Sequence, residues 1–164
     1  MAAPVIDTAE TPTLILGGGL AGLSFAIALA TEAPSLDITL LEAHPFRSGT
    51  PNPMDTRGSA LNLHSVELLK HWDLWSALAS HTGAIGDIHV SHRGHFGSAL
   101  MTAEELDVPA LGYVVENHEL GRALLARAEQ LAVTVRAPVR CVSLEAGAEK
   151  PAVLTDEGER LTAD

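Results

Sequence analysis

The apolar positions near the start of the chain change their spacing at a run of glycines. Residues 13–16 form a short, largely apolar run, which is typical of a buried parallel strand. Residues 20–32 follow a helical pattern in which small residues recur at every fourth position. A second apolar run, residues 36–41, ends at an acidic residue. This order predicts two parallel strands joined by a right-handed helical crossover, which opens a Rossmann-like α/β fold.

The pattern after these elements predicts a long loop and then mixed helices and strands. Residues 44–60 are rich in Pro, Gly, Ser and Asn, so we expect a loop there. Two short helices are expected after Ser65 and Asp73, because both are residue types that cap helices. The other predicted elements are strands at 87–91, 98–101, 112–116 and 133–136, a helix at 117–131, and short strands separated by turns between 141 and 164.

Charge and composition exclude several kinds of partner. The 164 residues carry a net charge of −11 without a cluster of Lys and Arg, so we expect neither a nucleic-acid partner nor a polybasic membrane patch. The apolar stretch Leu14–Ala30 is interrupted by glycines and preceded by acidic residues, which argues against a transmembrane segment or a signal peptide. Cys141 is the single cysteine, so the fold is expected to form without an internal disulfide, as in a reducing cytoplasm.

The glycines after the first strand have the spacing of a dinucleotide-binding turn. Gly17 permits the tight turn from strand to helix, Gly19 leaves room for a pyrophosphate, and Gly22 allows close packing of the helix. The backbone amides of Leu20 and Ala21 then point toward the phosphates from the helix N-terminus, where the helix dipole favours negative charge. The motif therefore predicts a site for the pyrophosphate of a dinucleotide.

Two further residues bear on which dinucleotide is bound. Glu42 ends the second strand, where its carboxylate would accept hydrogen bonds from ribose hydroxyls and would disfavour the 2′-phosphate of NADP. Arg57 lies in the long loop and could bind the phosphates or the ribityl chain of FAD. Two simpler readings stay open here, namely a glycine-rich turn beside a solvated Glu42 and an ordinary loop cation at Arg57.

Five segments resemble the flavin-dependent aromatic hydroxylases of ubiquinone biosynthesis, and most closely the 2-octaprenyl-6-methoxyphenol hydroxylases. The segments read LILGGGLAGLSFAIALA, DTRGSALNL, WDLWSAL, IHVSHRGHFGSALM and ALGYVVENHELGRAL, and the resemblance runs from Thr13 to about Leu161. It implies a class A flavoprotein monooxygenase that contains FAD and uses NAD(P)H and oxygen to hydroxylate a prenylated phenol. It also implies a place in a ubiquinone-pathway protein complex, in the cytoplasm or peripherally at the inner membrane.

The resemblance also implies roles for individual residues. Asn117 matches an amide residue that these enzymes place near FAD, and Val139 matches a strand position whose backbone meets the adenine. The implied cofactor-binding set is Gly17, Gly19, Leu20, Ala21, Gly22, Glu42, Arg57, Asn117 and Val139. No catalytic side chain is predicted, because no Ser, His and Asp form a recognisable triad. No metal site is predicted either, because no Cys or carboxylate lies among His89, His92 and His95 to complete a set of ligands.

The length of the chain shapes the expected domain organisation. Members of the resembled family are more than twice as long, and their second and third FAD fingerprints would come after Asp164. We therefore expect residues 1–12 to be a disordered leader and residues 13–164 to be the N-terminal part of an FAD-binding domain, with strands in 85–116 contributing to the substrate domain. Such a chain is expected to be inactive alone. A non-catalytic nucleotide-binding or docking module and an NAD-dependent dehydrogenase fragment remain as alternatives.

Overall fold

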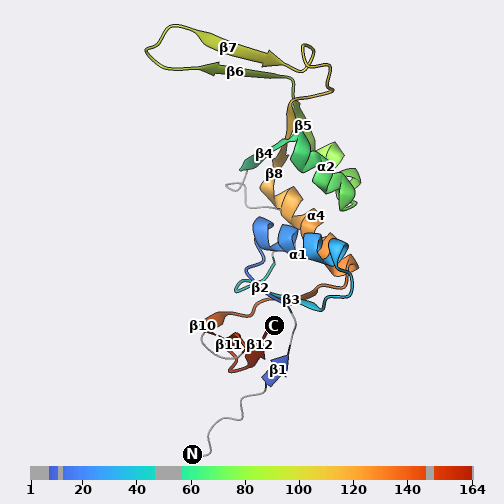
Figure 1. Ribbon diagram of the computed structural model, residues 1–164, viewed down its shortest axis with the longest axis vertical. Helices are drawn as coiled ribbons and strands as arrows, with labels where there is room; N and C mark the ends of the chain where they lie inside the picture. Colours follow the sequence, from blue (N-terminus) through green and yellow to red (C-terminus); the bar gives the residue numbers. More distant parts are fainter. Residues whose placement is uncertain (1–7, 11–12, 47–56, 147–149, 164) are drawn as a thin grey trace, which may run out of the picture. The chain divides into compact units, whose positions relative to one another are not determined.

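The computed structural model describes residues 8–10, 13–46, 57–146 and 150–163. The chain divides into two compact units (Figure 1). Residues 1–50 together with 124–164 form the first unit, and residues 51–123 form the second. Within the part of the chain that the structure describes, no helix is long and apolar enough to cross a membrane.

A parallel sheet forms the centre of the first unit. Its order is β2 (Thr13–Leu16), β3 (Ile38–Leu41) and β9 (Thr134–Arg136), and all pairs are parallel. Helix α1 (Leu20–Glu32) makes the connection from β2 to β3. All four residues of β3 are buried, as the continuous apolar run predicted. The expected Rossmann-like α/β fold is therefore confirmed.

Helix α1 packs on this sheet through small and branched apolar side chains. The buried positions are Leu23, Ala26, Ile27 and Ala30. A Cβ at Gly22 would lie 3.7 Å from Cγ2 of Ile15 on β2, so the helix approaches the sheet closely at its first turn. The small-residue stripe at 22, 26 and 30 thus lets the helix and the strands come together.

A second sheet in the first unit contains the C-terminal strands. Its order is β1 (Thr8–Glu10), β12 (Arg160–Thr162), β11 (Ala152–Thr155) and β10 (Cys141–Glu145). Residues 8–10 were expected to belong to a disordered leader, but β1 pairs with β12 in parallel. This pairing depends on a strand about 150 residues away, so the polar composition of the segment gave no sign of it. Leu41, Val139, Val153 and Leu161 form a buried cluster in this unit.

The second unit is built on an antiparallel sheet of order β4 (Gly58–Asn62), β8 (Gly112–Glu116) and β5 (Thr82–Ile85). Helix α2 (Leu63–His71) contacts β4 and β8, and α3 (Trp75–Leu78) is followed by the 3-10 turn η1 (Ala79–His81). Strands β6 (Asp87–Ser91) and β7 (Ser98–Thr102) form a separate hairpin. Helix α4 (Asn117–Gln130) begins in this unit directly after β8.

Three local predictions in the second unit were wrong. Residues 58–60 were expected to be loop but belong to β4, because they pair with β8. Helix α2 is capped by Asn62, whose side chain accepts a hydrogen bond from the amide of Ser65, so Ser65 lies inside the helix. Asp73 does not cap α3 either, since it adopts a φ of 58° in the turn before it.

Candidate cofactor site

The glycine turn between β2 and α1, here called the glycine cradle, faces open space on one side, at Gly19. Gly17 has a φ of 102°, which L side chains rarely adopt. Gly19 is extended, with φ −71° and ψ −179°, and a Cβ placed on it would meet no atom within 4 Å. A Cβ on Gly22 would instead lie 1.9 Å from the carbonyl oxygen of Gly17. Gly17 and Gly22 are therefore required by the fold, whereas Gly19 faces open space.

The N-terminus of α1 lies at this cradle and has no side-chain cap. Gly19 is the N-cap and provides no side chain to cap the helix, and the first turn contains no acidic residue. The amides of the first helical residues, including Leu20 and Ala21, lack partners within the helix itself because of helix geometry. Uncapped amides and the positive end of the helix dipole together favour an anion at this place.

The side chain of Glu42 is fixed beside the same turn. One carboxylate oxygen accepts a hydrogen bond from the amide of Gly18 at 2.7 Å, and the other accepts one from the amide of His44 at 2.9 Å. Partial burial raises the pKa of the Glu42 carboxyl, but these hydrogen bonds and the nearby His44 ring lower it by more, so the pKa lies below its ordinary value. A carboxylate has about four acceptor positions, so Glu42 keeps capacity for further donors.

Gly18 is a site residue that the spacing of the motif did not single out. A Cβ on Gly18 would lie 2.6 Å from the Phe46 ring and 2.9 Å from the Cβ of Glu42. Only glycine therefore lets the turn approach the end of β3 closely enough for the Gly18 amide to reach the carboxylate. The middle glycine of the run 17–19 was the available signal, but its contact lies 24 residues away in sequence.

Val139 lies next to Glu42 through the backbone. Its amide donates to the carbonyl oxygen of Glu42 at 2.8 Å, and the Glu42 amide donates to the carbonyl oxygen of Arg136 at 3.0 Å. Val139 was expected on a strand, but it lies in the connection between β9 and β10. The strand is interrupted there by Pro138, whose ring nitrogen has no hydrogen to donate to a sheet.

Arg57 and Asn117 come together in the second unit. The Asn117 amide donates to the carbonyl oxygen of Arg57 at 2.9 Å, and the Oδ1 atom of Asn117 accepts from the Ser59 hydroxyl at 2.7 Å. The pairing of β4 with β8 places Gly58 opposite Glu116 and so brings the two residues into contact. Asn117 begins α4, as the sequence predicted.

The predicted site residues thus fall into two groups. The glycine turn, Glu42 and Val139 belong to the first unit, and Arg57 and Asn117 belong to the second. Among the described residues, no group of three or more His, Cys, Asp or Glu side chains is arranged to hold a metal ion. The rings of His92 and His95 make an edge-to-face contact, with their ring centroids 4.3 Å apart.

This combination of an α/β fold, a glycine cradle at a helix N-terminus and an acid at the end of the next strand defines a dinucleotide-binding domain. The chain belongs to the FAD binding domain family, whose model matches residues 10–164. It is 31% identical over 168 residues to the ubiquinone hydroxylase UbiL of Rhodospirillum rubrum, covering 98% of this chain and 37% of that protein. It is 33% identical over 139 residues to 3-demethoxyubiquinol 3-hydroxylase of Escherichia coli, covering 82% of this chain and 34% of the relative.

Solved structures show the same fold. A flavin-dependent monooxygenase, PieE, in complex with FAD and substrate superposes with a TM-score of 0.72 at 20% identity, covering 99% of this chain and 30% of that one. The Diels-Alderase PyrE3 gives a TM-score of 0.69 at 27% identity, covering 96% of this chain and 31% of that one. The chain spans about a third of the length of the curated relatives it matches. The predicted resemblance to ubiquinone-pathway hydroxylases is confirmed.

Proposed function

We propose that this chain forms the ADP-binding end of the FAD site in a monooxygenase that hydroxylates a prenylated phenol in ubiquinone biosynthesis. The observation that carries the proposal is the glycine turn, where Gly19 faces open space at an uncapped helix N-terminus and the amide of the preceding Gly18 holds the Glu42 carboxylate. A pyrophosphate needs the open space and the amides, and a ribose needs the carboxylate.

The residues of the first unit fit the ADP part of FAD. Gly17 shapes the turn, Gly19 leaves the approach open, and the amides of Leu20 and Ala21 hold the pyrophosphate. Gly22 keeps α1 close to the turn, Glu42 accepts hydrogen bonds from the adenosine ribose, and Val139 contacts the adenine. Because the Val139 amide already donates to Glu42, the adenine contact falls to the carbonyl group of Val139.

Arg57 and Asn117 are proposed to hold the flavin side of the cofactor. A hydrogen bond between their backbones brings the two residues side by side, and a guanidinium with a side-chain amide suits phosphate and hydroxyl oxygens. When bound, FAD supplies the redox and oxygen chemistry, with NAD(P)H as co-substrate. The residues of this chain bind and orient the cofactor, and none is assigned a catalytic role.

The proposal extends to the surroundings of the enzyme. Two relatives at about 30% identity are named as ubiquinone-pathway hydroxylases, which supports a prenylated phenol as the substrate. Such a substrate is held in membranes, so we place the protein in the cytoplasm with peripheral access to the inner membrane and to other proteins of the pathway. Because the chain spans about a third of those relatives, we propose that it binds cofactor but does not hydroxylate phenols by itself.

The test is a binding experiment with one variant and one matched control. Gly19→Val fills the open space with a branched side chain and is expected to weaken FAD and ADP binding at least 100-fold by calorimetry. Gly83→Val makes the same substitution at another glycine that has no atom within 4 Å of its Cβ position, and it is expected to leave both affinities unchanged. Unchanged affinity in Gly19→Val would remove the basis of the site assignment.

The two alternatives predict different results in the same material. An NAD-dependent dehydrogenase fragment would bind NAD more tightly than FAD in a competition titration, whereas the proposed site prefers FAD. A docking module would bind other quinone-pathway proteins stably in a pull-down but show no preference between these nucleotides. Turnover of a phenol with oxidation of NAD(P)H by the 164-residue chain would contradict the proposal that it is inactive alone.

A further inference from the structure

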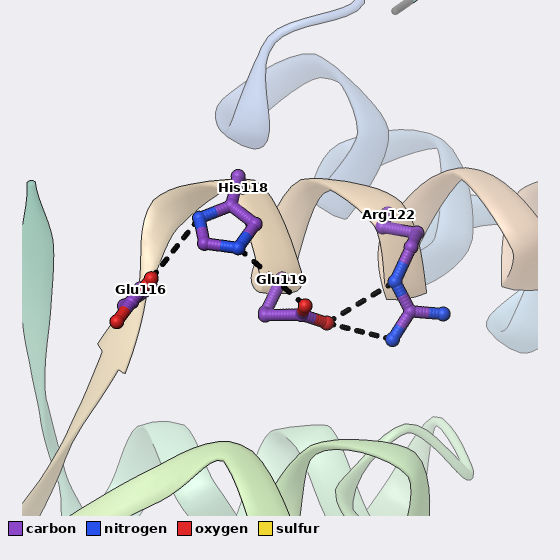
Figure 2. Close-up of polar contacts among 4 residues, drawn as sticks. All are labelled: Glu116, His118, Glu119 and Arg122. Carbon is purple, nitrogen blue, oxygen red and sulfur yellow. Dashed lines mark hydrogen bonds and ion pairs between the residues drawn. The ribbon is translucent and has the colours of Figure 1, made fainter. Parts of the chain in front are cut away.

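A polar network lies where β8 ends and α4 begins (Figure 2). The Nδ1 atom of His118 is 3.3 Å from a carboxylate oxygen of Glu116, and its Nε2 atom is 3.4 Å from one of Glu119. The other oxygen of Glu119 accepts hydrogen bonds from Arg122, the shorter at 2.6 Å. The imidazole therefore bridges the last residue of the strand and the first turn of the helix.

The ring of His118 is largely shielded from solvent. Its side chain is only 25% exposed, and its Nδ1 atom is shielded from solvent and makes no hydrogen bond within the described part of the chain. A shielded ring nitrogen is unfavourable unless a neighbouring group compensates for the lost water, and the Glu116 carboxylate lies within ion-pair distance of it.

Glu119 provides the second carboxylate that contacts the ring. The hydrogen bond from Arg122 lowers the pKa of the Glu119 carboxyl, and this effect together with the charges of Arg122, His81 and His118 exceeds the opposing effect of burial. The carboxylate therefore remains ionised near neutral pH, and one of its oxygens lies 3.4 Å from the Nε2 atom of the ring.

Asn117 lies in sequence between Glu116 and His118, whose side chains contact each other. On one side its backbone amide donates to the carbonyl oxygen of Arg57, and its Oδ1 atom accepts a hydrogen bond from the Ser59 hydroxyl. On the other side the chain continues directly into His118. Ser59 takes one of the two acceptor positions of Oδ1, and the two Nδ2 hydrogens of Asn117 can donate to an acceptor such as a hydroxyl or phosphate oxygen.

We propose that His118 is a positioning residue for Asn117. Its ring contacts both Glu116 and Glu119 and so fixes the junction of β8 and α4. This directs the side-chain amide of Asn117 toward the flavin side of the cofactor. This inference rests on the proposed function, because it assumes that Asn117 contacts FAD. It assigns a role to a residue that neither the glycine motif nor the spacing of the site residues indicated.

The test compares FAD with ADP, because ADP lacks the part of the cofactor assigned to Asn117. His118→Leu in the full chain is expected to weaken FAD binding about tenfold and to change ADP binding less than twofold. Asn117→Ala should have the same effect, and the double variant should lose no more than Asn117→Ala alone, since His118 acts through Asn117. His118→Gln, which keeps a donor able to reach Glu119, should recover most of the affinity. His64→Leu, at an exposed histidine of α2, is the matched control and should change neither affinity.

A second measurement needs no ligand. Hydrogen exchange at the backbone amide of Asn117 should be about tenfold faster in His118→Leu than in the wild-type chain, with unchanged exchange in β2 and β3. Additive losses in the double variant, equal losses for FAD and ADP, or an unchanged exchange rate would each overturn the role of His118. If Asn117→Ala itself leaves FAD affinity unchanged, the assignment of Asn117 in the proposed function fails, and the role of His118 fails with it.

Discussion

The tight packing of Gly22 against the backbone of Gly17 gives a prediction about stability that is separate from any effect on binding. Replacing Gly22 by Ala would place a Cβ 1.9 Å from the carbonyl oxygen of Gly17. Carbon atoms do not approach backbone oxygens closer than about 3 Å, so α1 and the turn must separate by roughly 1 Å. The obstructing atom belongs to the backbone, so no rotamer change of a side chain can relieve the contact.

The magnitude follows from two opposing terms. Ala is favoured over Gly inside a helix by about 1 kcal/mol. Overpacking typically costs about 1–3 kcal/mol, and a contact with backbone that no rotamer relieves puts this site at the upper end, about 3 kcal/mol. The net loss is therefore about 2 kcal/mol in the free energy of unfolding, which corresponds to a fall of about 4–8 °C in Tm for a chain of this size.

The assay is thermal unfolding followed by circular dichroism, with Gly19→Ala as the control. A Cβ on Gly19 enters open space, and the backbone there is already in a conformation that Ala adopts readily. We expect Gly19→Ala to keep the wild-type Tm, or raise it slightly, while it weakens ADP binding. A Tm for Gly22→Ala within 1 °C of the wild type would show that the tight contact between α1 and Gly17 does not limit stability.

Three further predictions concern charges and the core. The pKa of Glu42 is depressed in the folded protein, so its stabilising effect is complete above the ordinary value of 4.5 and is lost as the pH falls through the lower folded-state value; Glu42→Gln should cost about 1 kcal/mol in urea unfolding at pH 7 and progressively less as the pH falls below 4.5. Arg136 pairs with Glu159, and a double-mutant cycle with Gln at both positions should give a coupling of about 0.5–1 kcal/mol, whereas zero coupling would show the pair to be inert. Leu40 is fully buried and Leu36 is 41% exposed, so Leu40→Ala should cost about 3 kcal/mol and Leu36→Ala less than about 0.5 kcal/mol; equal losses would contradict the assigned core.

Local patterns predicted the elements that carry their own signals. The apolar run at residues 13–16, the small-residue helix at 20–32 and the strand at 112–116 all agree with the structure. The polar segments were predicted less well. Residues 8–10 and 58–60 form strands because a distant strand pairs with them, and neither segment has the apolar alternation that marks a strand by itself.

The sequence by itself determined the glycine turn, the helix that follows it and the acid at the end of the next strand, because steric freedom, helix period and hydrophobic burial act over a few residues. Only the tertiary structure joined Gly18 to Glu42 across 24 residues and Asn117 to Ser59 across 58. It also revealed that His118 lies between two carboxylates. These contacts depend on strand register and on the start of a helix packed beside it, and a shift of one residue in either would turn the side chains away from one another.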